Sequence, residues 1–127
     1  MDNVVHFEIP ASDMARAKKF YADVFGWQIN DVPGMEDQYS MCTTVETDEK
    51  QMPKTPGAIN GAIQKKGDTI MHPVIVIKVD SVDEAVKKAV AAGAKVVMPK
   101  VPVMEIGFYA RVEDTEGSII GLWEDKK

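Results

Sequence analysis

An internal duplication constrains the fold of this chain more than any other feature of its 127 residues. An alternating apolar segment at residues 5–9 is followed, over 14–25, by apolar residues at helical spacing. The same order returns at residues 74–93, and a shift of 68 positions places His6 on Val74. Farther on, GAINGAIQ at 57–64 matches GSIIGLWE at 117–124 with a shift of 60 positions. Two matches in the same order predict that one structural unit occurs twice.

The order of elements in each unit follows from its apolar patterns and chain breakers. A strand, a helix and three further strands are predicted in each unit, and the units span residues 1–64 and 72–127. Ser12 or Asp13 can cap the first helix, which should end at Gly26, and Ser81 can cap the second. About 60 residues with one helix can cover only one face of a sheet. We therefore expect one domain over residues 1–127 that contains two modules.

Composition excludes several classes of protein. An apolar content of 45% and a charged content of 28% are typical of a globular domain rather than a disordered chain. The net charge of −5 argues against a nucleic-acid partner, and no apolar segment is long enough for a membrane span. Cys42 is the single cysteine, so an internal disulfide and a cysteine-built zinc site are excluded. With no signal-peptide pattern at the start, we expect a cytoplasmic location.

Several motifs carry a family resemblance that extends over essentially the whole chain. They are the opening strand with His6, the segments 13–21 and 24–27, the segment 80–85 and the closing DTEGSIIGLWE. Together they resemble the vicinal oxygen chelate superfamily, which includes glyoxalase I, bleomycin-resistance proteins and extradiol dioxygenases, and most of all small proteins related to lactoylglutathione lyase. The resemblance implies an α+β fold in which two βαβββ modules form a curved mixed sheet cup, with helices outside and a ligand inside. It also implies a homodimer.

The same resemblance bears on a metal. Metal-dependent members of the family hold a divalent ion with four His or Glu side chains, and the matching positions here are His6, Gly61, Val74 and Gly121. Glycine and valine carry no donor atoms, so we expect neither a metal nor another cofactor. A shifted site that uses His6 and His72, with Glu8 and Glu124 as oxygen donors, is the alternative left open.

Two titratable side chains on the first strand are candidate catalytic groups. His6 and Glu8 are two residues apart, so they project from the same face of the strand. The ordinary pKa of histidine suits proton transfer, and a carboxylate can serve as a base. A hydrogen-bonded structural histidine and a solvated glutamate are the alternatives.

A second set of residues is predicted to bind the ligand. Gly61, Val74 and Gly121 would line the floor of the cup, where a missing side chain lets a ligand approach the backbone. Trp123 lies on the same face as Gly121 by alternation and could form an aromatic wall. Met104, in a predicted loop at 101–107, could cover the mouth.

Three functions fit this sequence. The first is metal-free binding of a small molecule. The second is a lyase or isomerase that acts on a small carbonyl or hydroxy-acid substrate, with His6 or Glu8 as acid or base. The third is a dimeric interaction module without chemistry.

Overall fold

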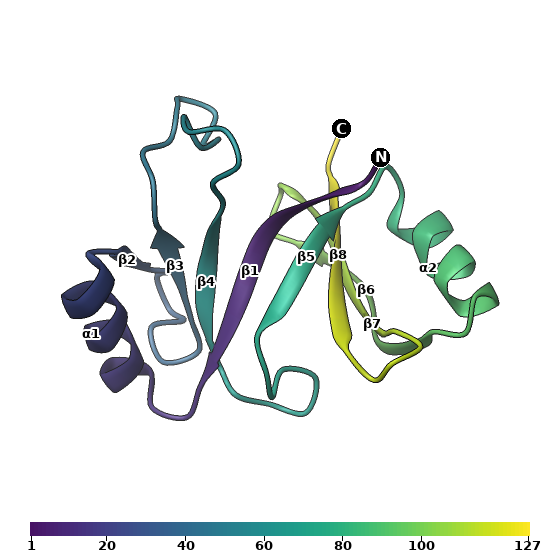
Figure 1. The fold of residues 1–127 in the computed structure, drawn as a ribbon, viewed down its shortest axis with the longest axis horizontal. Coiled ribbons are helices and arrows are strands. Elements are labelled where there is room, and N and C mark those ends of the chain that lie inside the picture. Colours follow the sequence, from purple (N-terminus) through teal and green to yellow (C-terminus); the bar gives the residue numbers. More distant parts are fainter. The chain divides into compact units, whose positions relative to one another are not determined.

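The computed structural model describes all residues from Met1 to Lys127, and each half of the chain has the element order strand, helix, strand, strand, strand (Figure 1). The elements of the first half are β1 (Asn3–Ala11), α1 (Met14–Phe25), β2 (Gln28–Asp31), β3 (Tyr39–Thr43) and β4 (Asn60–Lys65). Those of the second half are β5 (Val74–Lys78), α2 (Val82–Ala91), β6 (Lys95–Val103), β7 (Gly107–Glu113) and β8 (Ile119–Asp125). The α+β class with two βαβββ modules is thus confirmed.

Contacts divide the chain into two compact units. The first module is His6–Pro73, and the second is Val74–Lys127 together with Met1–Val5. Each module has the same sheet topology, with a parallel pair between its first and last strands and antiparallel pairs elsewhere. The strand order is β2-β3-β4-β1 in the first module and β5-β8-β7-β6 in the second.

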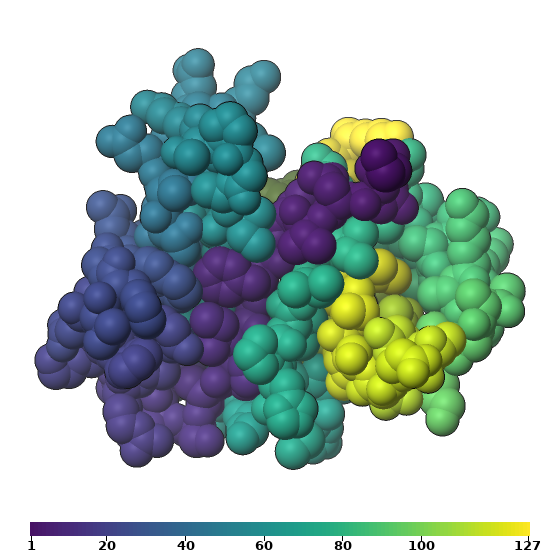
Figure 2. Space-filling model, in the orientation of Figure 1, coloured from purple at the N-terminus to yellow at the C-terminus, as the bar shows by residue number.

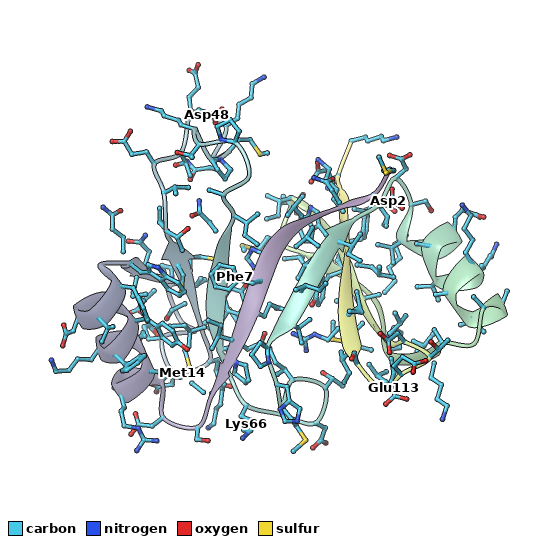
Figure 3. All side chains as sticks on the ribbon, viewed as in Figure 1. Asp2, Phe7, Met14, Asp48, Lys66 and Glu113 are labelled. Atoms are coloured by element: carbon cyan, nitrogen blue, oxygen red, sulfur yellow. The ribbon has the colours of Figure 1, made fainter.

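The core of the first module lies between α1 and one face of its sheet. Met14 from the helix packs with Ala11, Cys42 and Ile63 from three strands, and Phe7 lies against this cluster (Figure 3). Because alternate residues of a strand point to opposite faces, His6 and Glu8 project from the face opposite α1. The prediction that His6 and Glu8 project from the same face of the first strand is therefore correct.

Helix α1 begins and ends at the residues that its sequence indicates. The Asp13 side chain accepts a hydrogen bond from the amide of Arg16 at 3.0 Å, and Gly26 ends the helix with a left-handed φ of 71°. Of the apolar residues that recur at helical spacing over 14–25, however, only Met14 at the start of the helix is fully buried. Val24 and Phe25, in the last turn, are 57% and 58% exposed.

The second module has an equivalent core formed by Val79, Val82, Ala110, Val112 and Leu122. The start of α2 is capped twice. The Ser81 hydroxyl accepts the amide of Glu84 at 3.2 Å, and the carboxylate of Glu124 on β8 accepts the amide of Val82 at 2.6 Å. Glu124 thus holds the start of α2 against the sheet. This contact explains why the closing motif contains a glutamate without assigning it to a metal site.

One strand is longer than the sequence predicted. We expected a loop at residues 101–107, but β6 continues to Val103 and joins β7 by a tight turn. Pro99 and Pro102 are tolerated because β6 is the edge strand of the module and its pairing with β7 is irregular. Met104 lies in that turn, 71% exposed and with a φ of 47°, so the predicted long covering loop is not present.

The connection between β3 and β4 projects from the first module (Figure 2), and Asp48 lies at its tip (Figure 3). Its base is held by Asn60, whose side-chain oxygen accepts a hydrogen bond from the amide of Thr44 at 2.7 Å.

Neither α1 nor α2 is long and apolar enough to cross a bilayer.

Candidate functional site

The polar face of the first module's sheet carries the two candidate catalytic groups. His6 is half-buried, whereas Glu8 is only 4% exposed. In the parallel pair of β1 with β4, His6 lies opposite Asn60 and Glu8 lies opposite Ala62. Glu8 is one of two buried charged side chains in the chain, and the other is Arg111 in the second module. This face therefore places a buried carboxylate beside a half-buried imidazole.

A third group of this face comes from β3. The Tyr39 hydroxyl lies 3.5 Å from Nε2 of His6, at the limit of a hydrogen bond. No sequence pattern singles out Tyr39, because its proximity to His6 depends on the strand order that places β4 between β1 and β3. The described arrangement is therefore an imidazole with a carboxylate on its own strand and a phenol from another strand.

The environment of His6 favours its neutral form. Burial lowers the pKa of His6 below its ordinary value because the imidazolium loses hydration, and the charge of Glu8 only partly opposes this effect. A neutral imidazole has one nitrogen that accepts a proton and one that donates a hydrogen bond. At neutral pH, His6 can therefore act as a base or as a hydrogen-bonding partner for a polar ligand.

Gly61 lies on the other face of this sheet, contrary to its expected place on the cup floor. It pairs with Phe7 on β1 and with Cys42 on β3, both of which pack toward α1. A Cβ added to Gly61 would lie 2.5 Å from two atoms of the Phe7 ring. The glycine makes room for the core rather than for an opening on the polar face.

The repeat alignment is displaced by one residue at this point. Gly121 pairs with Val76 in the second module. The residue equivalent to Val76 at a shift of 68 positions is Glu8, which pairs with Ala62. Ala62 is therefore the structural equivalent of Gly121, and the GAINGAIQ and GSIIGLWE segments match in sequence with their glycines on different faces.

In the second module, Gly121 does lie on the face opposite the helix, but the space beside it is filled. A Cβ added there would lie 2.4 Å from the Tyr109 hydroxyl. That hydroxyl accepts a hydrogen bond from Nε of Arg111 at 3.1 Å, and Arg111 is 3% exposed. The tyrosine and arginine pair, rather than an open floor, characterises this part of the sheet.

The other predicted ligand-binding residues are distributed over the second module. Trp123 is half-buried, lies opposite Tyr109 in the pairing of β7 with β8, and donates from Nε1 to Asp125 at 2.6 Å. Val74 is buried at the start of β5. Met104 belongs to the exposed turn between β6 and β7. Gly121 and Trp123 share one face of β8 by alternation, as expected, whereas Met104 is not part of that face.

The family's metal does not fit the residues of this chain. With the corrected register, the four ligand positions are His6, Ala62, Val74 and Gly121, and only His6 has a donor atom. Of the further donors that a shifted site would need, Glu124 caps α2 and His72 is exposed in the connection that follows β4. No group of three or more His, Cys, Asp or Glu side chains lies close enough to hold an ion.

Cys42 is not an activated nucleophile. Burial raises the pKa of its thiol to about 11, although a hydrogen bond with the backbone of Ile63 acts in the opposite direction. A thiol with so high a pKa is almost fully protonated at neutral pH. Cys42 is therefore a core residue of the first module.

Comparisons with known proteins agree on the family. A model described as the Glyoxalase/Bleomycin resistance protein/Dioxygenase superfamily matches residues 3–122. The protein named "Putative glyoxylase CFP32" of Mycobacterium bovis is 35% identical over 122 residues, which are 92% of this chain and 43% of that protein. The protein of the same name from Mycobacterium tuberculosis matches equally. The chain thus spans less than half the length of these curated relatives.

Solved structures share the fold at low sequence identity. A methylmalonyl-CoA epimerase of Streptomyces coelicolor superposes with a TM-score of 0.67 at 14% identity, covering 98% of this chain and 97% of the epimerase. A glyoxalase/bleomycin resistance protein/dioxygenase superfamily member from Vibrio splendidus 12B01 superposes with a TM-score of 0.63 at 14% identity. The match covers 99% of this chain and 100% of that protein. Because the family model covers nearly the whole chain, this protein belongs to the glyoxalase/bleomycin resistance protein/dioxygenase superfamily.

Proposed function

We propose that this protein binds a small organic molecule through the face of the first module that carries His6, Glu8 and Tyr39, without the metal used by other family members. The observation that carries the proposal is the placement of a half-buried imidazole within 3.5 Å of a phenol, on the same face as a buried carboxylate. Polar groups gathered on a partly desolvated surface fix the orientation of a ligand. The lack of donors at three family ligand positions supports metal-free binding.

Carbonyl and hydroxy-acid compounds are the ligand class that this chemistry favours. A neutral His6 accepts a hydrogen bond from a hydroxyl or donates one to a carbonyl, and the Tyr39 hydroxyl can do both. The relatives are named for a glyoxylase and for a methylmalonyl-CoA epimerase, and both names refer to carbonyl compounds. We therefore place small 2-hydroxy acids, 2-oxo compounds and acyl thioesters first among the ligands.

A lyase or isomerase is the second candidate, and the low pKa of His6 favours it. A histidine that stays neutral at pH 7 can remove a proton from carbon next to a carbonyl group, provided that the developing charge is stabilised. The Tyr39 hydroxyl is a candidate donor to that charge. Turnover that disappears in His6→Gln would support this candidate over simple binding.

A thermal-shift screen of the protein, after treatment with EDTA, tests the proposal. The panel contains lactate, pyruvate, methylglyoxal, lactoylglutathione and methylmalonyl-CoA. We expect at least one compound to raise the Tm of the unaltered protein and of His72→Gln, but not of His6→Gln. His72 is the matched control because it is the chain's other histidine and is exposed. Equal shifts in all three proteins, or shifts that require added metal, would contradict the proposal.

An interaction module remains the alternative if every compound fails. In that case the edge strands β2 and β6 are the surfaces with unpaired backbone groups, and pairing between two chains would satisfy them. Light scattering at several protein concentrations measures the proposed homodimer directly. The cytoplasmic location stays a prediction.

A further inference from the structure

We propose that a second site, at the carboxyl end of α1 in the first module, binds a small organic ammonium ion. The site is a cavity of about 410 Å³ between the end of the helix, the start of β2 and the connection between β3 and β4. Its lining contains none of His6, Glu8 and Tyr39, so it is separate from the proposed ligand face. The lining residues are Gly26, Gln28, Thr43, Thr44, Val45, Glu46, Thr47 and Lys54.

The end of α1 supplies negative potential to this cavity. Gly26 donates its amide to the carbonyl of Ala22, but the carbonyls of Asp23, Val24 and Phe25 accept no backbone hydrogen bond. These unpaired carbonyls carry the negative end of the helix dipole. The last turn of α1 has no basic residue, whereas that of α2 has Lys88. The helix itself therefore supplies no cation at this end.

Glu46 adds a full negative charge to the lining. Its carboxylate lies 3.8 Å from the ammonium of Lys54, which is too long for a hydrogen bond. Both side chains are largely exposed, and such pairs contribute little to stability. The ammonium group of Lys54 lies near this carboxylate without bonding to it, and the loose geometry leaves it replaceable by a ligand with the same group.

Uncharged acceptors complete the site. The hydroxyls of Thr43 and Thr47 and the side-chain amide of Gln28 make no hydrogen bond within the protein, although the two threonines are half-buried. An ammonium group has three N–H donors, so it can bond to Glu46 and to two further oxygens of this kind. An anion would be attracted by Lys54 but repelled by Glu46, and the negative end of the helix dipole also disfavours it. The ligand class is accordingly a primary alkylammonium ion.

Titration with propylammonium chloride, followed by the amide signals of Gly26, Thr43 and Thr44 in NMR, tests the proposal. Sodium chloride and 1-propanol are the controls for ionic strength and for the alkyl group. We expect saturable shifts at these amides with propylammonium alone. Glu46→Gln should weaken binding roughly threefold or more, and Lys54→Met should tighten it about two- to fivefold, because one removes the anion and the other removes the competing cation.

Glu49→Gln is the matched control, since Glu49 is exposed on the same connection and does not line the cavity. It should leave the affinity unchanged. An equal loss in Glu49→Gln and Glu46→Gln would show that only the general charge of the connection matters, and would overturn the site. Shifts that are absent, unsaturable or equal with sodium chloride would also overturn it. The proposed function does not depend on either outcome.

Discussion

The aromatic ring of Phe7 occupies the place that a side chain on Gly61 would take. Two ring carbons and the carbonyl oxygen of Phe7 lie 2.5 Å from the position of an added Cβ, far closer than van der Waals contact permits. Phe7 in turn lies 5.5 Å from Trp27, measured between ring centroids, as part of the core beside α1. The glycine of the first repeat thus has a packing role.

Gly61→Ala should therefore destabilise the protein, by about 1–3 kcal/mol, because the core must shift to admit one methyl group. Urea unfolding followed by tryptophan fluorescence measures the change in the free energy of unfolding. Gly67→Ala is the control, since no atom lies within 4 Å of its added Cβ and its φ is not in the left-handed region. Equal stability of Gly61→Ala and the unaltered protein would show that Phe7 does not hold this position.

Loss of the Glu124 carboxylate should also lower stability. Glu124→Ala leaves the amide of Val82 at the start of α2 without its acceptor, and we expect a cost of about 1–2 kcal/mol. Glu124→Gln keeps an oxygen acceptor and should cost less. Glu105→Ala, which removes a mostly exposed ion pair with Lys126, should change stability by no more than about 0.5 kcal/mol. A cost of Glu124→Ala as small as that of Glu105→Ala would count against the cap.

The stability of the protein should depend on pH through His6. The native pKa of His6 lies below its unfolded value of 6.5, so the unfolded state binds a proton first as the pH falls. The stability contribution is fully present above pH 6.5 and is lost as the pH falls from 6.5 through the native pKa. Unfolding free energies measured between pH 7.5 and 5 should fall more steeply for the unaltered protein than for His6→Gln. Parallel slopes would contradict the burial effect.

The Cys42 thiol should be almost inert in the folded protein. With a pKa of about 11, its thiolate fraction at pH 8 is roughly 100-fold below that of a free cysteine. Reaction with a chromogenic disulfide reagent should therefore be slow in buffer and fast in denaturant. Rapid modification of the native protein would show that Cys42 is more accessible and more ionised than its 1% exposure implies.

Much of the fold could be predicted from the sequence because its signals are local. The duplicated strand and helix pattern, the cap at Asp13 and the turn at Gly26 depend on residues close in the chain. The prolines of β6 misled the prediction because an edge strand tolerates residues that an inner strand excludes. No local pattern shows that β6 is an edge.

The candidate site was predicted less completely because it depends on register. Alternation was enough to place His6 and Glu8 on one face, but the proximity of Tyr39 requires the order of three strands. The paired glycines misled the alignment by one residue, and a slip of one residue moves a side chain to the other face. Only the observed strand pairing shows that Ala62, and not Gly61, is the structural equivalent of Gly121.

Isothermal titration of the EDTA-treated protein with Zn²⁺ or Ni²⁺ tests the central claim, that the His6 face functions without the family's metal. We predict no saturable heat at micromolar concentrations, because three of the four family ligand positions carry no donor atom and no group of three or more His, Cys, Asp or Glu side chains lies close enough to hold an ion. One ion bound per chain with submicromolar affinity, lost in His6→Gln and kept in His72→Gln, would contradict the claim.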